Sequence, residues 1–171
     1  MSGRDRVCGA ADLTAMLAIV NAAARAYAGV IPADRWREPY MSEEVLRREI
    51  AAGVAFLGHE VGTALVGVMG IQAKGEVTLI RHAYVHPDFQ RRGIGAALLD
   101  AIRAQAETPL LVGTWAAAVW AVRFYERHGF RLVSAAEKDR LLAAHWSIPM
   151  RQIETSVVLA DDAWFTVRGV A

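Results

Sequence analysis

The sequence has little cysteine, little excess charge and no long apolar run, and each shortage excludes a class of protein. Cys8 is the single cysteine of the 171 residues, which excludes an intramolecular disulfide framework and a thiolate zinc cluster. A formal net charge of +1 argues against a dedicated nucleic-acid-binding protein, which concentrates basic residues on one face. The longest mostly apolar stretch, residues 61–71, contains three glycines and is too short to cross a bilayer.

These shortages also indicate the setting and the size of the protein. Residues 1–6 lack the apolar core of a signal peptide, so we expect a cytoplasmic protein with no nucleic acid and no membrane as partner. Cys8 has no histidine beside it in the sequence, which favours a buried or edge thiol over a nucleophile. A length of 171 residues, 54% of them apolar, predicts a single domain over residues 1–171.

The most informative segment is a glycine-rich loop between a strand-like and a helix-like run. Residues 77–85 predict a strand, residues 94–106 predict a helix, and residues 90–96, Gln-Arg-Arg-Gly-Ile-Gly-Ala, join them. The first N–H groups of a helix have no intrahelical partner and lie at its positive end, so such a loop binds phosphate without a metal. Gly93 and Gly95 let an anion approach the backbone, and the two arginines add full positive charges.

Other interpretations of this loop fit less well. A Walker loop requires a lysine after its last glycine, and none follows here. A dinucleotide-binding fingerprint requires a third small residue where this chain has Leu98. A plain strand-to-helix turn, whose glycines only relieve strain, stays open on the loop alone.

A second block follows at residues 120–130. Ala121, Phe124 and Tyr125 lie in a predicted helix that ends at Gly129, a typical residue after a helix C-terminus, and Phe130 begins the next predicted strand. For an isolated tyrosine in such a helix, the ordinary interpretation is a core aromatic with a satisfied hydroxyl.

The two blocks, in this order, resemble the signatures of the GNAT superfamily of acyl-CoA-dependent N-acyltransferases. The resemblance implies coenzyme A, in the form of acetyl-CoA, as cofactor and no metal. It implies Tyr125 as the general acid that protonates the departing thiolate. One departure is Ala118, where family members often carry an asparagine that contacts the pantetheine arm. The implied cofactor contacts are the backbone of Tyr84 and Val85 and the loop residues Gln90, Arg91, Arg92, Gly93, Ile94, Gly95 and Ala96.

The predicted elements match the order of that fold over nearly the whole chain. The resemblance therefore implies an α+β fold with a mostly antiparallel sheet of six to seven strands, helices on both faces and one splayed parallel strand pair. The predicted strands are residues 6–8, 54–59, 63–72, 77–85, 110–113, 131–134 and 155–159. The predicted helices are residues 12–27, 42–52, 94–106, 117–128 and 137–145.

The acceptor side is less defined. The aromatic loop with Trp36 and Tyr40 lies where the family forms its acceptor wall, although both rings could equally join the first two helices. Arg81 lies on the strand before the loop, where many members carry a base, and an arginine there suits a carboxylate-bearing substrate. His145 is a further candidate for the acceptor side. By strand alternation His82 points to the opposite face, unless a bulge resets the register.

The expected activity is transfer of an acetyl group from acetyl-CoA to a primary amine of a small-molecule acceptor by direct attack. A base is expected as well, because a free alkyl amine is mostly protonated at neutral pH. Besides the histidines, Glu60 is a candidate base that would act through water. A non-catalytic acyl-CoA sensor and a protein N-acetyltransferase are the alternatives. A homodimer is also open, because members of the family frequently form one.

Overall fold

The computed structural model describes residues 3–169, which divide into two compact units. The first unit contains the residues up to Ala26, Arg37–Ala73 and Ile80–Ala106; the second contains Tyr27–Trp36, Lys74–Leu79 and the residues from Glu107 onward. The strands are β1 (Gly3–Val7), β2 (Ala55–Val61), β3 (Ala64–Lys74), β4 (Val77–Val85), β5 (Leu110–Trp115), β6 (Arg131–Leu132) and β7 (Ser156–Ala160). The α-helices are α1 (Leu13–Ala24), α2 (Glu43–Ala51), α3 (Ile94–Gln105), α4 (Val119–Arg127), α5 (Ala135–His145), α6 (Met150–Glu154) and α7 (Asp162–Val167). Short 3₁₀ turns are η1 (Ala10–Asp12), η2 (Arg25–Tyr27) and η3 (Pro87–Phe89).

Within residues 3–169, hydrogen-bonded strands follow the order β1-β2-β3-β4-β5-β7-β6 in a seven-stranded, mostly antiparallel sheet. The parallel pair is β4 with β5, and the N–H of Thr78 donates to the carbonyl of Pro109 over 2.9 Å just before β5 begins. The predicted fold class is therefore confirmed.

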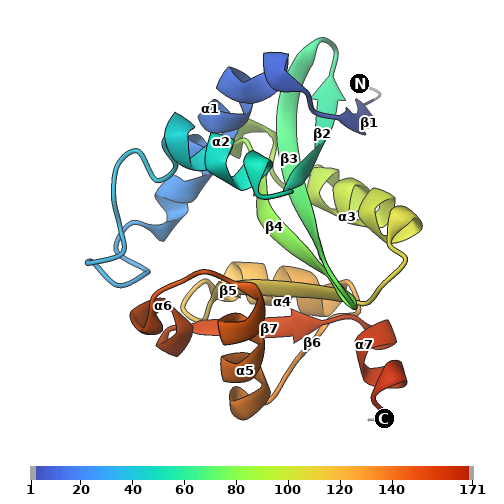
Figure 1. Ribbon diagram of the computed structural model, residues 1–171. Coiled ribbons are helices and arrows are strands. Elements are labelled where there is room, and N and C mark those ends of the chain that lie inside the picture. The colour runs from blue at the N-terminus through green and yellow to red at the C-terminus, as the bar shows by residue number, and fades with distance from the viewer. Residues whose placement is uncertain (1–2, 170–171) are drawn as a thin grey trace. The chain divides into compact units, whose positions relative to one another are not determined.

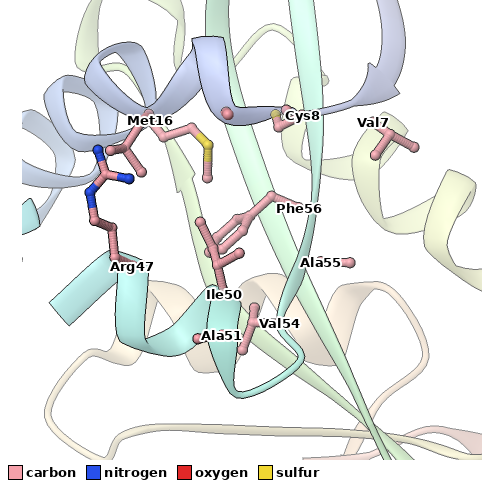
Figure 2. A pocket seen from close by; sticks show the side chains of 12 residues that line it. Val7, Cys8, Met16, Arg47, Ile50, Ala51, Val54, Ala55 and Phe56 are labelled. Atoms are coloured by element: carbon pink, nitrogen blue, oxygen red, sulfur yellow. The ribbon is translucent and has the colours of Figure 1, made fainter. Parts of the chain in front are cut away.

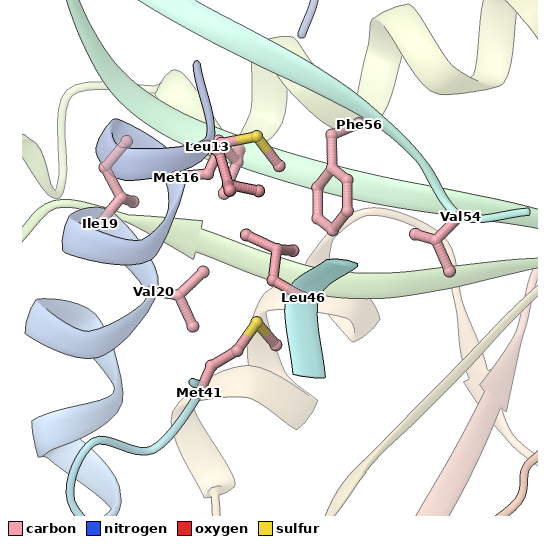
Figure 3. Packing of buried hydrophobic residues seen from close by; sticks show 9 residues of the cluster. Leu13, Met16, Ile19, Val20, Met41, Leu46, Val54 and Phe56 are labelled. Carbon is pink, nitrogen blue, oxygen red and sulfur yellow. The ribbon is translucent and has the colours of Figure 1, made fainter. Parts of the chain in front are cut away.

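The first unit places helices on both faces of its strands (Figure 1). Consecutive strand residues point to opposite faces, and Gly67 and Val68 of β3 show this alternation. A Cβ atom on Gly67 would meet Ile94 and Leu98 of α3, whereas Val68 belongs to the core that α1 and α2 cover. In that core Leu46 of α2 lies between side chains of α1 and Phe56 of β2 (Figure 3).

The second unit packs α5, α6 and α7 against β5 and β7. β5 runs antiparallel to β7, with Leu111 opposite Ala160 and Trp115 opposite Ser156. The core of the second unit consists of apolar side chains from these elements and from the start of β4, namely Val77, Leu79, Leu111, Leu141, Leu142, Ile153, Val158, Ala160 and Trp164.

Most predicted elements are present, with shifted ends. Ser42 caps α2 as expected, because its Oγ accepts a hydrogen bond from the N–H of Val45 at 3.2 Å. β1 begins three residues earlier than expected and ends at Val7. The helix predicted from residue 117 begins only at Val119, because the N–H of Ala118 first turns back to the carbonyl of Trp115. Helices α6 and α7 were not predicted, although Asp161 caps α7 through the N–H of Trp164.

Candidate active site

The predicted phosphate loop has open backbone donors at the start of α3. Gly93 adopts a left-handed φ of 80° at the N-cap, and the first intrahelical bond runs from Ala97 N–H to the Gly93 carbonyl. Within residues 3–169, no backbone N–H of residues 91–96 donates a hydrogen bond. Three of these donors, those of Ile94, Gly95 and Ala96, belong to the first turn of the helix, where the dipole favours an anion.

Side chains on the loop itself hold it in this form. The side-chain amide of Gln90 donates to the carbonyl of Val85 over 3.0 Å, which ties the loop to the end of β4. Arg92 donates from Nη2 to the carbonyl of Asp88 at 2.9 Å and covers the ring of Phe89 at 5.1 Å. Arg91 is exposed and makes no ion pair or hydrogen bond with any described residue. Open N–H groups beside an unengaged guanidinium fit the diphosphate of coenzyme A.

The end of β4 presents backbone groups beside this loop. The N–H of His86 donates to the carbonyl of Val66 on β3 at 2.8 Å. Because backbone groups alternate between the two sides of a strand, the N–H of Val85 points away from β3. Tyr84 packs its side chain against the core of the first unit, and the predicted cofactor contact is with its backbone. His86 belongs to the turn, as expected, and its Nδ1 accepts from the N–H of Asp88 at 3.3 Å.

Tyr125 lies in α4 of the second unit and is 4% exposed. Its ring packs edge-on against Phe124 and Phe130, with centroids 5.0 and 5.4 Å away. Burial, and then the neighbouring Tyr27, raise the pKa of Tyr125 well above its ordinary value. Within the described residues its hydroxyl makes no hydrogen bond. This side chain therefore stays protonated at neutral pH and keeps its proton free to donate. Ala118, buried at the N-cap of the same helix, brings no polar group.

On the acceptor side, Arg81 is already engaged within the first unit. Its Nη2 lies 3.0 Å from Oε2 of Glu49 on α2, and its Nη1 donates to Oε1 of Gln72 on β3 over 2.9 Å. Burial lowers the pKa of Arg81, whereas the charge of Glu49 raises it. A substrate carboxylate at Arg81 would compete with Glu49 for the guanidinium.

His82 does not point to the opposite face, because the strand is irregular there. Its φ of 52° is left-handed, and its Nε2 lies 3.1 Å from the same Oε2 of Glu49 that Arg81 contacts. The pKa of Glu49 is lowered, first by the hydrogen bond from His82. Burial acts in the opposite direction, and the charge of Arg81 lowers the pKa further. The alternation expected for a regular strand is therefore wrong at His82, because its left-handed φ accompanies a side chain that contacts the same Glu49 as Arg81 does.

The other predicted acceptor residues are divided between the two units. Tyr40 packs on the core of the first unit, and Trp36 is half-buried in the second unit. His145 ends α5 and lies edge-on to Trp146, with centroids 6.4 Å apart. Burial, and then the charges of Arg140 and Lys74, lower the pKa of His145, which keeps its imidazole neutral at neutral pH.

Glu60, the candidate base acting through water, is occupied by two guanidinium groups. Arg6 and Arg4 lie 2.6 and 2.8 Å from its carboxylate oxygens, and their hydrogen bonds lower the pKa of Glu60. The arrangement does not favour Glu60 as a base. Glu49, in contrast, was not singled out from the sequence, because only the fold places its helix against β4.

A separate apolar pocket of about 490 Å³ opens in the first unit between α1, α2 and the start of β2 (Figure 2). Met16, Ile50 and Phe56 are among its lining residues, with Cys8 and Arg47. None of the residues predicted to bind the cofactor or the acceptor lines this pocket.

Fold, loop and sequence together define an acetyltransferase that uses acetyl-CoA. The family model of the acetyltransferase (GNAT) domain matches residues 20–151, and the chain belongs to the GNAT family. No curated protein sequence is significantly similar to the chain. Among the described residues, no helix is long and apolar enough to cross a membrane.

Solved structures of the same fold include several acetyltransferases. The PaiA N-acetyltransferase of Thermoplasma acidophilum, in complex with coenzyme A, superposes with a TM-score of 0.70 at 18% identity, over 94% of this chain and 99% of that chain. The ribosomal-protein-S18-alanine N-acetyltransferase of Escherichia coli gives 0.66 at 16% identity, over 94% and 93%. A GNAT family acetyltransferase of Elizabethkingia anophelis with acetyl-CoA bound gives 0.59 at 17% identity, over 93% and 97%.

Proposed function

We propose that this chain is an N-acetyltransferase that moves the acetyl group of acetyl-CoA to a primary amine of a small-molecule acceptor by direct attack, with Tyr125 as general acid. The observation that carries the proposal is the state of Tyr125, a buried and protonated side chain whose hydroxyl has no hydrogen-bond partner among the described residues. Such a hydroxyl breaks no existing hydrogen bond within the protein when it donates its proton to a leaving group.

The cofactor would be held by the first unit. The N–H groups of residues 91–96 and the guanidinium groups of Arg91 and Arg92 would bind the diphosphate, and the backbone of Tyr84 and Val85 would bind the pantetheine arm. Acetyl-CoA supplies a thioester, whose carbonyl carbon accepts the amine and whose sulfur leaves. The N–H of Val85 would stabilise the charge that develops on the carbonyl oxygen.

The acceptor would be bound by Arg81, Tyr40, Trp36 and His145, as predicted. The guanidinium of Arg81 already pairs with one carboxylate, that of Glu49, so its chemistry suits a carboxylate, and a substrate carboxylate would compete with Glu49 for it. We expect Arg81→Ala to raise KM for acceptors with a carboxylate and to leave KM for neutral acceptors unchanged. An equal rise for charged and uncharged acceptors would exclude this role for Arg81.

We further propose that residues 1–171 form one N-acetyltransferase domain. The family match over residues 20–151 supports this, because it includes parts of both compact units.

The test is a thiol-release assay with acetyl-CoA and a panel of amino acids, polyamines, aminoglycosides, arylamines and peptides. We expect release with one class of small amine. We expect Tyr125→Phe to lower kcat by roughly a hundredfold or more, the usual contribution of a general acid, and to leave the Kd for acetyl-CoA unchanged. Calorimetry with acetyl-CoA is the control that separates lost chemistry from lost binding. Binding without release over the whole panel would favour the acyl-CoA sensor, and release with peptides alone would favour a protein acceptor.

A further inference from the structure

The first unit contains a histidine and a carboxylate in contact, and the histidine belongs to β4, the predicted cofactor strand. His82 and Glu49 lie 3.1 Å apart, and their side chains are 18% and 21% exposed. Neither residue has a role in the function proposed above, which leaves the base for the acceptor amine unassigned.

The chemistry of the pair determines which ring nitrogen carries the proton. The lowered pKa of Glu49 keeps it a carboxylate, and a carboxylate only accepts hydrogen bonds. In the neutral ring, the proton is therefore on Nε2, which donates to Glu49, and the lone pair is on Nδ1. Within residues 3–169, Nδ1 has no hydrogen-bond partner and is not among the buried unpaired atoms. An open lone pair on a neutral imidazole is a proton acceptor.

Contacts from two neighbouring elements and from Arg81 on its own strand fix the ring in this orientation. Phe56 of β2 stacks on it with centroids 6.1 Å apart, Glu49 of α2 accepts from it, and Arg81 of β4 shares the same carboxylate oxygen. Arg81 and Glu49 are the charged groups that contact this cluster, and Gln72 of β3 holds the far side of Arg81. The left-handed φ of His82 is a conformation that residues other than glycine rarely adopt, and such conformations concentrate at functional sites.

The position of His82 suits an acceptor that meets the end of β4. Three steps along the strand, roughly 10 Å, lead from His82 to Val85, whose N–H would face the thioester carbonyl. Phe56, which stacks on His82, belongs to the same core as Tyr40, a predicted acceptor residue. A base at His82 would take a proton, directly or through one water, from an amine bound between His82 and Val85.

We propose that His82 is the general base of the acetyl transfer and that Glu49 is its positioning residue. This assignment rests on the proposed N-acetyltransferase function. Nδ1 of His82 takes one proton from the ammonium form of the acceptor and passes it to solvent, which leaves a neutral amine. The amine nitrogen then forms the C–N bond while the C–S bond breaks. Nitrogen loses its second proton to Nδ1 of His82, which is neutral again by then, while Tyr125 gives its proton to the sulfur. Return of a proton from solvent to Tyr125, and release of the proton on His82 to solvent, restore both residues.

The test compares variants of the pair in the thiol-release assay as a function of pH. We expect His82→Asn, which tolerates a left-handed φ, to lower kcat by about a hundredfold with KM for acetyl-CoA within twofold of wild type. His82→Gly also suits this φ, and we expect added imidazole to restore part of its rate. We expect Glu49→Gln to lower kcat about tenfold and to move the acid limb of the kcat/KM profile to lower pH, because the imidazolium loses its counter-charge.

The matched control is His59→Asn. His59 is also a strand histidine of the first unit and also contacts a carboxylate, Asp5, with Nδ1 and Oδ1 2.6 Å apart. We expect this variant to keep the wild-type kcat and the wild-type acid limb. Folded His82 variants with wild-type kcat, or a His82→Gly enzyme that imidazole does not rescue, would overturn the assignment while the proposed function stands. A wild-type protein inactive on every amine would overturn both.

Discussion

Gly70 of β3 lies directly against the backbone of Arg81 in β4, because a Cβ atom at position 70 would come within 2.8 Å of the Arg81 carbonyl oxygen. The same atom would come within 2.9 Å of Val54 and 3.0 Å of Phe56. The irregular segment of β4, where Arg81 and His82 both contact Glu49, therefore requires a residue without a side chain on the neighbouring strand.

Gly70→Ala tests this relationship. We expect a loss of about 1–3 kcal/mol in the free energy of unfolding, because the contact is with backbone, which does not yield as a side chain would. We also expect kcat to fall, because relief of the contact moves residues 81 and 82. Urea unfolding and the thiol-release assay measure the two effects. Gly9→Ala is the control, since Gly9 has an ordinary φ of −119° and open space around it, and a change there should stay within about 0.5 kcal/mol. An equal effect at both positions would contradict the role of Gly70.

The predictions that held from sequence are those whose signals are local. Glycines, arginines, a preceding strand and a following helix are contiguous at residues 77–106, so the strand, the loop and the helix were predictable. The same is true of the α2 cap at Ser42 and of the hairpin at Gly62. Each depends on residues a few positions apart.

The features that escaped prediction depend on contacts between distant segments. In the cluster of Glu49, Arg81 and His82, the contact between Glu49 and His82 joins residues 33 positions apart. It also depends on the left-handed φ of His82, which no local sequence pattern predicts. The backbone of Arg81 in this cluster also lies where a side chain at position 70 would collide with it. Helix α7 differs, because Asp161 is a local cap signal, and a helix there could have been predicted.

Gly93→Ala tests whether the phosphate loop depends on the left-handed N-cap. Nothing lies within 4 Å of a Cβ atom at Gly93, so alanine adds backbone strain of about 1–2 kcal/mol rather than a clash. Relief of this strain would change the loop conformation and turn its N–H groups away from the bound diphosphate. We therefore expect the Kd for acetyl-CoA, measured by calorimetry, to rise about tenfold. Gly75→Ala is the matched control, because Gly75 has a φ of 63°, equally open surroundings and a place in the turn before β4. It should cost similar stability without changing the Kd; the same Kd in both variants would contradict the prediction.

Protonation of Asp12 in acid is expected to lower the free energy of unfolding. Hydrogen bonds from Arg6, and then from the N–H of Gly9, lower the pKa of Asp12 from 3.8 to about 2. A carboxyl with a lowered pKa in the folded state stabilises the protein above its ordinary pKa, and that contribution disappears as pH falls from about 4 to about 2. We expect Asp12→Asn to be less stable than wild type at pH 7 and the difference to shrink over that interval in urea unfolding. Asp100→Asn, which removes an exposed carboxylate 3.8 Å from Arg103, is the control for loss of a surface charge. A difference that stays constant down to pH 2 would contradict the assigned cause.

We expect the thiol of Cys8 to react slowly with alkylating agents, although Cys8 lines the apolar pocket of the first unit. Burial, and then the charge of Asp12, raise the pKa of Cys8 to about 11, and the thiolate is the reactive form. At pH 8 the thiolate fraction is then roughly a hundredfold or more below that of a free cysteine with a pKa of about 8.5. We expect alkylation by iodoacetamide to be slower by about that factor in the native protein than in the same protein unfolded in urea, followed by mass spectrometry. Cys8→Ser should keep the wild-type rate of thiol release. Equal alkylation rates in the two states, or loss of activity in the serine variant, would show that this thiol is activated and takes part in function.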